Sequence, residues 1–292
     1  MQTAYRIERP TGVSQPVVLA SPHSGDYYPD TLLRMSRLSL ALLRRSEDAY
    51  VHELFRDGPV LGMPLIAATH ARAYVDLNRA PYELDPAMFA EPLPSFAQPD
   101  TDRVAAGLGV LPRVAGIGLD IYTAKLPLAE AQQRIENIYR PYHNALKSLV
   151  EETRSEHGYA VLLDCHSMPS AALPPDRPGH RQADVVLGDR WGAACNSGVR
   201  QLLRQGFERA GYRVALNEPY SGGHTTEIHG APSRGLHVIQ IELNRRLYMD
   251  ETRLTRTSNL AALRDDICDI LSRFAAGLPA LGLDRPLRAA AE

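Results

Sequence analysis

Short apolar runs recur along the chain and are separated by segments in which apolar residues are spaced as in helices. Short runs bounded by Gly, Pro and polar residues indicate buried strands, whereas longer periodic segments indicate helices. The expected strands are residues 16–20, 64–69, 159–163, 183–189, 212–216 and 237–241. The expected helices are residues 32–43, 46–55 and 128–152, a helix that follows residue 189 and ends near 210, and residues 254–278. Strands that alternate with helices predict an α/β fold with a mixed, mostly parallel central sheet flanked by helices on both faces.

Other parts of the chain are less regular. Residues 72–79 either extend the strand at 64–69 as one bent strand or pair with it as a hairpin. Residues 80–127 are rich in Pro and Gly, and an irregular insertion of this length is usually functional, as a lid or a pocket wall. The chain shows no repeat and no linker, so we expect residues 1–292 to form a single domain with a frayed tail at about 280–292.

Two expected helices carry features that bear on the chemistry below. Ser46 is a good N-cap for the helix at 46–55, which would place Glu47 and Asp48 in its first turn. Compensation of the helix dipole would explain both acids, and it is the preferred explanation for Glu47. Pro141 should kink or divide the helix at 128–152.

Composition narrows the class of protein. Hydrophobic residues make up 44% of the chain, enough for a sizeable core, and the net charge of −2 gives no reason to expect a nucleic acid as partner. Cys165, Cys195 and Cys268 are odd in number and form no CxxC motif, which favours reduced thiols. The N-terminus lacks the apolar core of a signal peptide, and no apolar run approaches membrane-spanning length. We therefore expect a soluble cytoplasmic protein of undetermined oligomeric state that binds no membrane.

Candidate chemistry gathers just after the expected strands. His23 follows the strand at 16–20, and His166 follows the strand at 159–163. Open α/β sheets place their active sites at strand ends, so two histidines there could share a divalent metal with one carboxylate. A lone histidine is more often structural, but two that each follow a strand and precede a serine favour a shared ion.

A carboxylate follows a third strand. Glu242 comes directly after the run at 237–241, and a rigidly held carboxylate suits a general base, although a salt bridge to Arg245 would also explain it. The polar segment at 221–230 offers a second possible metal site, because it carries His224, Glu227 and His229 within six positions. Without a buried strand to hold all three, that site is the less favoured of the two.

Five motifs occur in an order that resembles the N-formylglutamate amidohydrolase family, over about residues 15–272. They are SPHSG (21–25), YVDLNR (74–79), DCHSMP (164–169), GGHT (222–225) and QIELNR (240–245). The resemblance implies a fold like that of the zinc carboxypeptidases, a zinc-exopeptidase or phosphorylase-hydrolase-like architecture with the metal at strand ends. It also implies zinc or another divalent metal, amide hydrolysis, and a small N-acyl amino acid as substrate.

The resemblance assigns roles to the candidate catalytic and metal-binding residues. It implies that His23 and His166 are metal ligands and that Asp48 supplies the carboxylate, ahead of Glu47 and Asp26. It implies that Glu242 is the general base, which takes a proton from the attacking water and returns it to the leaving amine nitrogen.

Further residues would contact the substrate. The resemblance pairs Asn78 with Arg79, whose guanidinium suits a carboxylate or the charge that develops during the reaction, although a salt bridge from Arg79 to Asp76 is the structural alternative. It implies a substrate-binding loop at Gly222, Gly223, His224 and Thr225. Arg245 could hold a second substrate carboxylate or pair with Glu242, and Asp76 and Asp164 could orient metal-bound histidines.

The leading hypothesis is a metal-dependent hydrolase that releases formate from N-formyl-L-glutamate in histidine catabolism. A deacylase or deformylase of another N-acyl amino acid is the first alternative, because His224 stands where the resemblance leads us to expect a tyrosine. A non-catalytic metal-binding protein with the same fold is the second alternative, which retention of Glu242 and both histidines disfavours.

Overall fold

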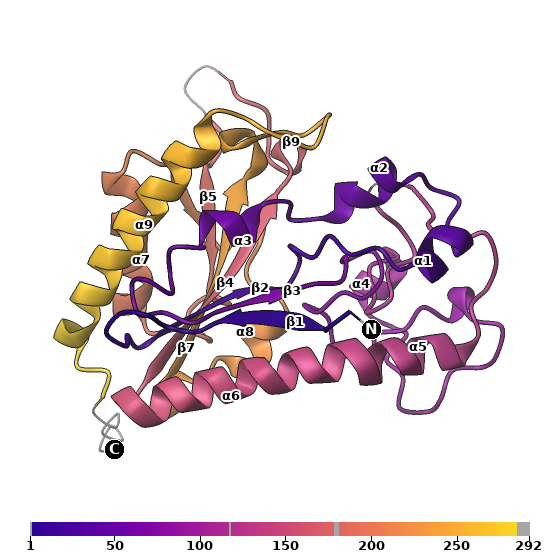
Figure 1. The fold of residues 1–292 in the computed structure, drawn as a ribbon, viewed down its shortest axis with the longest axis horizontal. Coiled ribbons are helices and arrows are strands. Elements are labelled where there is room, and N and C mark those ends of the chain that lie inside the picture. The colour runs from indigo at the N-terminus through magenta and orange to yellow at the C-terminus, as the bar shows by residue number, and fades with distance from the viewer. Residues whose placement is uncertain (1, 117, 178–180, 285–292) are drawn as a thin grey trace. The chain divides into compact units, whose positions relative to one another are not determined.

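The computed structural model describes residues 2–116, 118–177 and 181–284 (Figure 1). Its main sheet has seven strands in the order β1-β3-β2-β4-β7-β5-β6. Their bounds are β1 Tyr5–Glu8, β2 Val17–Ser21, β3 Leu65–Ala68, β4 Ala160–Met168, β5 Val185–Gly188, β6 Val214–Leu216 and β7 Leu236–Asn244. A small two-stranded sheet pairs β8 (Met249–Asp250) with β9 (Thr255–Arg256).

The main sheet is mixed and mostly parallel, which confirms the predicted fold class. Strand β4 pairs in parallel with β2 and with β7, and β5 pairs in parallel with β6, while β5 and β7 are antiparallel. Every residue of β2, β4 and β7 is buried, as expected for central strands covered on both faces.

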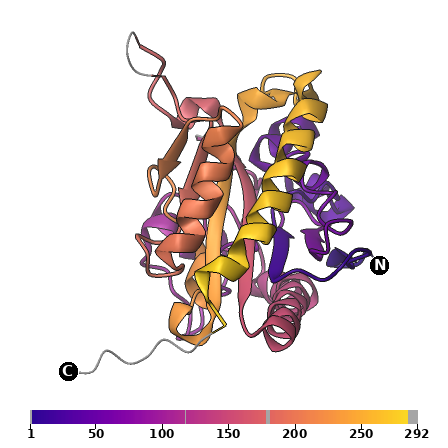
Figure 2. The ribbon, with the colours of Figure 1, turned by 90° about the vertical axis from the view of Figure 1, so that its left-hand side faces the viewer.

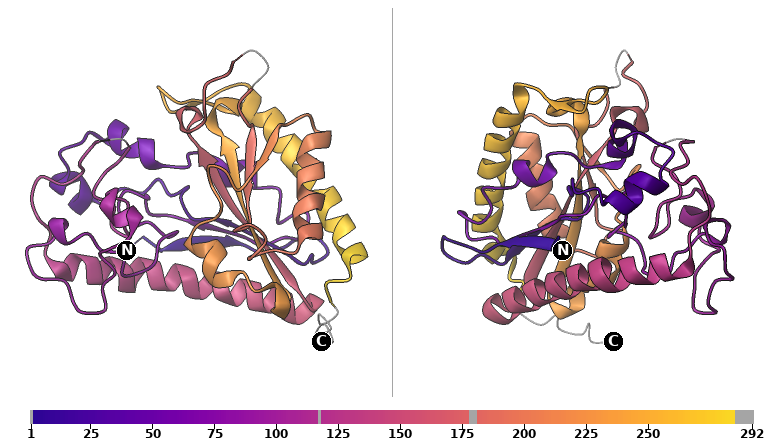
Figure 3. Two further views of the ribbon diagram at one scale, coloured as in Figure 1. Left: turned by 180° about the vertical axis from the view of Figure 1, so that it is seen from behind. Right: turned by 45° about the vertical axis from the view of Figure 1, so that its right-hand side comes forward.

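Helices flank the sheet. Their bounds are α1 Asp30–Met35, α2 Leu40–Leu43, α3 Val51–Leu54, α4 Asp102–Ala105, α5 Leu128–Arg134, α6 Arg140–His157, α7 Ser197–Arg209, α8 His224–His229 and α9 Asn259–Gly277. Helices α7 and α9 pack side by side (Figure 2). Helix α8 contacts β7 on the face of the sheet opposite α7 and α9 (Figure 3).

The chain divides into two compact units, each made of several segments whose backbones lie close together. The first comprises the N-terminal residues up to Arg6, Pro22–Ala49 and Ala67–Ala145. The second comprises Ile7–Ser21, Tyr50–Ile66 and the residues from Leu146 onward. A single domain over 1–292 therefore stays a prediction, and residues 285–292 of the expected frayed tail lie outside the described residues.

The two central strands β4 and β7 are longer than predicted. Their parallel ladder continues past the apolar runs to the pairs His166–Glu242 and Met168–Asn244. The prediction that His166 and Glu242 come after their strands is therefore wrong, because both lie within them. Polar side chains are compatible with a strand when they alternate with apolar ones and share one face.

The helices predicted at 32–43 and 46–55 are both interrupted. Ser36 is extended, bridges to Tyr122 and ends α1 before α2 begins. Ser46 does not cap a helix but ends a 3-10 turn at Arg44–Ser46, and Glu47 is extended. Helix α3 starts only at Val51, since Tyr50 adopts the left-handed conformation with φ of 67°. Glu47 and Asp48 therefore precede the helix instead of forming its first turn.

The segment at 72–79 forms turns, so both strand predictions for it are wrong. The backbone N–H of Asp76 donates to the Val110 carbonyl, and the Asp76 carboxylate accepts from the N–H of Asn78 at 2.9 Å. The insertion at 80–127 is irregular as predicted, apart from α4 and a 3-10 turn at Pro86–Met88. The predicted break near Pro141 takes the form of a π-helical turn, Ile135–Tyr139, between α5 and α6.

Two predictions about the chain as a whole can be compared with the structure. The three cysteines are free thiols, two of them buried, as their spacing predicted. None of the helices in the described part of the chain combines the length and the hydropathy that a membrane span requires.

Candidate functional site

One face of β4 and β7 carries polar side chains that lie side by side. In the parallel register Asp164 is the partner of Gln240, and His166 is the partner of Glu242. Neighbouring strands lie about 4.8 Å apart, and residues two apart on a strand share a face. Asp164, His166, Gln240 and Glu242 therefore form one polar patch, although each is almost completely buried. Within it, His166 Nε2 lies 3.1 Å from Asp164 Oδ2.

His23 is fixed by two acids. It follows β2, and its Nε2 lies 2.7 Å from Asp76 Oδ1, while its Nδ1 lies 3.4 Å from Asp48 Oδ2. The backbone N–H of Asp48 also donates to the His23 carbonyl. A carboxylate that accepts from Nε2 favours the tautomer whose lone pair is on Nδ1, the form that a metal ion requires.

Asp76 is held in its charged form. Burial alone would raise the pKa of this carboxyl, but Arg72, His23 and Arg79 together hold its pKa well below the usual value. The Arg72 guanidinium donates to Asp76 Oδ2 at 2.8 Å, and Arg79 Nε lies 3.9 Å from the same oxygen. Asp76 is therefore an ionised acceptor whose contact with Nε2 is suited to orienting the His23 ring, while its role behind a metal ligand stays a prediction.

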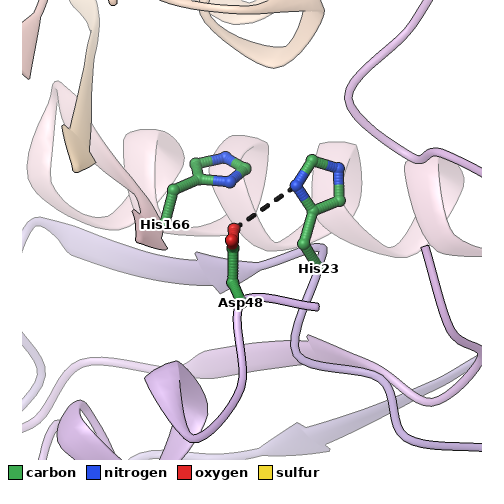
Figure 4. A group of neighbouring side chains, drawn as sticks. All are labelled: His23, Asp48 and His166. Atoms are coloured by element: carbon green, nitrogen blue, oxygen red, sulfur yellow. Dashed lines mark ion pairs between the residues drawn. The ribbon is translucent and has the colours of Figure 1, made fainter. Parts of the chain in front are cut away.

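The structure brings His23, Asp48 and His166 together (Figure 4). Each offers one ligand atom, and these atoms all lie within 4.8 Å of one another. In Figure 4 the Asp48 carboxylate points toward the two imidazole rings, and the dashed line marks its ion pair with His23. Two imidazoles and one carboxylate are a donor set that zinc favours when it keeps a further position open for water. The chemistry of these residues therefore fits a divalent metal.

The other acids considered as ligands have different surroundings. Asp26 is exposed and is not part of this group. Glu47 is buried, but it accepts from Tyr28 Oη at 2.7 Å and pairs with Arg44 at 3.0 Å. Burial and the Glu47 charge raise the pKa of Tyr28, so this phenol keeps its proton and remains the donor. Glu47 thus serves a local polar network.

The alternative metal site on α8 is not assembled in the described part of the chain. The Glu227 side chain is 54% exposed and pairs with Arg190 at 3.2 Å. His229 is partly buried, and this burial lowers its pKa to about 4. Across residues 2–116, 118–177 and 181–284, His23, Asp48 and His166 are the one group with metal-ligand geometry.

The predicted substrate-binding loop is partly helical. Gly222 has a φ of 118°, and helix α8 begins at His224, so Thr225 lies in its first turn instead of in a loop. Thr225 is buried. The N–H of Gly223 donates to Gln240 Oε1 at 2.7 Å, so its partner in this structure is a side chain of the protein itself.

The two candidate substrate arginines contact the protein itself. Arg79 is largely buried, and its Nε and Nη1 donate to the carbonyls of Leu108 and Asn78 at 2.9 and 2.8 Å. Burial lowers the pKa of Arg79. Arg245 is also buried, and its Nε donates to Ser167 Oγ at 3.1 Å. The proposed contacts of Arg79 and Arg245 with substrate stay predictions.

Comparison with known proteins establishes the family. Residues 15–249 match the family model of N-formylglutamate amidohydrolase. The chain belongs to the N-formylglutamate amidohydrolase family. The resemblance inferred from the five motifs is thereby confirmed, and the chain is a hydrolase of the amidohydrolase class.

Similar proteins cover most of the chain. The N-formylglutamate deformylase of Pseudomonas putida is 30% identical over 244 residues, which span 81% of this chain and 83% of that protein. The N-formylglutamate deformylase of Pseudomonas aeruginosa is 29% identical over 239 residues, with the same coverage. The crystal structure of N-formylglutamate amidohydrolase from Ralstonia eutropha matches with a TM-score of 0.88 and 34% identity, over 94% of this chain and 98% of that one.

One residue of the polar patch on β4 and β7 was not identified from the sequence as a candidate. Gln240 donates from Nε2 to Glu242 Oε1 at 2.8 Å, yet it was read as part of the apolar run at 237–241. The signal was the alternation of Gln240 and Glu242 with Ile239, Ile241 and Leu243, which places the polar pair on one face of a strand.

Proposed function

We propose that this member of the family hydrolyses the formyl amide of N-formyl-L-glutamate, giving formate and L-glutamate, with a divalent metal held by His23, Asp48 and His166. The observation that carries the proposal is the convergence of these two imidazoles and one carboxylate, with ligand atoms within 4.8 Å. Zinc suits this donor set best, although a mixed nitrogen and oxygen site accepts other divalent ions. The reaction belongs to histidine catabolism in the cytoplasm.

The catalytic role of each group follows from its chemistry. A divalent ion at such a site lowers the pKa of water and polarises a carbonyl oxygen. Glu242, the cross-strand partner of His166, accepts the proton of the attacking water and delivers it to the leaving amine nitrogen. Asp76 and Asp164 hold the imidazoles of His23 and His166 in the ligating orientation.

Binding of the substrate requires partners for two carboxylates. We propose that Arg79 and Arg245 supply positive charge, because guanidinium groups suit carboxylates. Asn78 and the segment Gly222, Gly223, His224 and Thr225 would form the rest of the binding surface. Since His224 differs from the tyrosine expected there, it is the residue to test if another N-acyl amino acid proves the better substrate.

The test is an assay of formate release by the purified protein, combined with measurement of bound metal. We expect turnover of N-formyl-L-glutamate, loss of turnover with a chelator, and recovery when zinc is added back. N-acetyl-L-glutamate and N-formyl-L-aspartate serve as competing substrates. A preference for one of them would replace the substrate proposal, and bound zinc without turnover of any N-acyl amino acid would support a non-catalytic metal-binding protein.

Replacing Asp76 with asparagine should weaken metal binding about 10- to 100-fold, the usual cost of losing a partner behind a metal-bound histidine. The amide lacks the charge that now orients the His23 ring across 2.7 Å. Competition with a chromogenic chelator measures the affinity. The control is Asp120→Asn, which removes a largely exposed carboxylate paired with Arg113. Unchanged affinity in folded Asp76→Asn would remove Asp76 from the metal site.

Replacing Arg79 with alanine should raise KM about tenfold if its guanidinium holds a substrate carboxylate, since each 1.4 kcal/mol of binding is a factor of ten. It should also lower the free energy of unfolding by about 1–3 kcal/mol, because the carbonyls of Leu108 and Asn78 lose their donor. Steady-state kinetics and urea unfolding separate the two effects. Arg140→Ala, at an exposed site, is the control. Lower stability with an unchanged KM would assign Arg79 a structural role alone.

A further inference from the structure

Gln240 connects the proposed base to the backbone of the segment that leads into α8. Its side chain lies within the polar patch on β7 and is buried. At one end its Nε2 donates to Glu242 Oε1 at 2.8 Å, and at the other its Oε1 accepts from the N–H of Gly223 at 2.7 Å. A single amide therefore spans two parts of the proposed active site.

The orientation of this amide follows from its partners. The Gly223 N–H is a donor, so it requires the oxygen end of Gln240. The NH₂ end must then face Glu242, which as a carboxylate accepts hydrogen bonds. A reversed amide would set donor against donor at Gly223 and acceptor against acceptor at Glu242. The backbone of Gly223 thus determines that Gln240 presents a donor to the base.

A second feature brings Gly223 within reach of Gln240. In the antiparallel pairing of β5 with β7, the partner of Gln240 is Gly188. A Cβ atom at Gly188 would lie 2.6 to 2.8 Å from backbone atoms of Tyr220, Ser221 and Gly222, far inside normal contact. The absence of a side chain at Gly188 lets this backbone pass directly over the sheet beside Gln240. The N–H of Arg190 also donates to the Ser221 carbonyl at 2.7 Å, which holds the backbone in place.

The segment held in this way leads into the proposed substrate-binding residues. Gly222 takes a φ of 118°, which L-residues with a side chain rarely adopt, and α8 begins two residues later at His224. The position of Gly223 therefore determines where His224 and Thr225 lie on the face that carries Glu242.

We infer that Gln240 is a positioning residue for the hydrolytic reaction: its amide fixes the Glu242 carboxylate and, through Gly223, sets the position of the substrate-binding segment relative to that carboxylate. The inference rests on the proposed role of Glu242. Gln240 touches neither water nor substrate in this scheme and acts through Glu242 and Gly223. Loss of its amide leaves the base in a range of orientations and loosens the backbone at Gly223.

The test is Gln240→Met, which keeps the length of the side chain and removes both hydrogen bonds. We expect kcat to fall about 10- to 100-fold, by analogy with the loss of a hydrogen-bond partner that orients a metal ligand. Hydrogen exchange of the Gly223 amide, measured without substrate, should become faster. Gln205→Met, which removes a half-buried glutamine on α7 that accepts from Arg209, should change neither quantity.

A second variant separates the two ends of the amide. Gln240→Glu keeps an acceptor for the Gly223 N–H but sets a carboxylate against Glu242, so exchange at Gly223 should stay slow while kcat falls. If Gln240→Met does not fold, Gln240→Glu still tests whether Gln240 positions Glu242. An exchange rate at Gly223 that is unchanged in Gln240→Met, or a kcat within twofold of the wild-type value in either variant, would overturn the inference. If the wild-type protein releases no formate, the proposed function fails, while hydrogen exchange still tests the link between Gln240 and Gly223.

Discussion

Glu242→Gln should lower kcat by about 10³-fold, within the range attributed to general acid–base catalysis. The glutamine side chain has almost the same shape but cannot take a proton from water at neutral pH. Its amide can still contact Gln240, so the strand and the neighbouring patch should keep their structure. The measurement is steady-state formate release at saturating N-formyl-L-glutamate, with metal content and melting temperature recorded for the same sample.

Glu227→Gln is the matched control for this substitution. Glu227 lies on α8 in the same compact unit as Glu242, but it is largely exposed and pairs with Arg190. We expect it to keep wild-type kcat and metal content. A normal kcat in Glu242→Gln would show that another group accepts the proton. Loss of metal together with kcat would instead assign Glu242 to metal binding.

The sheet could be predicted because its central strands are strongly apolar. The runs at 159–163 and 237–241 identified β4 and β7, because a parallel strand that is buried on both faces is an almost continuous run of hydrophobic residues. The ends of these strands were harder to place. Asp164 and Glu242 resemble turn residues when the chain is read locally, and only the pairing of β4 with β7 reveals that both lie inside the ladder.

The convergence of His23 and His166 was predicted from a general property of parallel sheets. The carboxyl ends of neighbouring parallel strands meet at one edge, and β2 and β4 are such neighbours. The choice of Asp48 depended on the family pattern, not on local structure. The sequence pattern predicts a helix there, whereas Asp48 precedes α3, which begins at Val51, and its backbone N–H donates to the His23 carbonyl.

The path of the chain around Asp76 could not be predicted from residue patterns. Residues 72–79 have the alternation of a strand, but the segment turns because its backbone bonds to Val110, in the irregular insertion. Contacts between distant segments decided the conformation there, and such contacts leave no periodic signal in the sequence. The same applies to Gly188, whose missing side chain makes room for a backbone more than thirty positions away.

His166→Ala should reduce metal affinity by at least 100-fold, because loss of a direct ligand exceeds the 10- to 100-fold cost of losing a partner behind it. His166 supplies one of the three ligand atoms that lie within 4.8 Å of one another, and two ligands hold an ion much less tightly than three. Turnover should be lost with the metal, and a large excess of zinc should restore it only in part. Equilibrium dialysis against a buffered series of zinc concentrations measures the affinity independently of activity.

His237→Ala is the control for His166→Ala, because it also removes a buried histidine from the central strands. His237 is also a buried histidine of the central strands, and burial lowers its pKa to about 4, so like a metal ligand it is neutral at pH 7. It differs in its partner, since its Nδ1 accepts from the N–H of Asn196 and it lies outside the metal group. Both substitutions remove a buried imidazole and should cost stability, but only His166→Ala should lose the ion. If both variants retained the metal equally well, the proposed metal centre would be contradicted. His166 would then behave like any other buried histidine of this sheet.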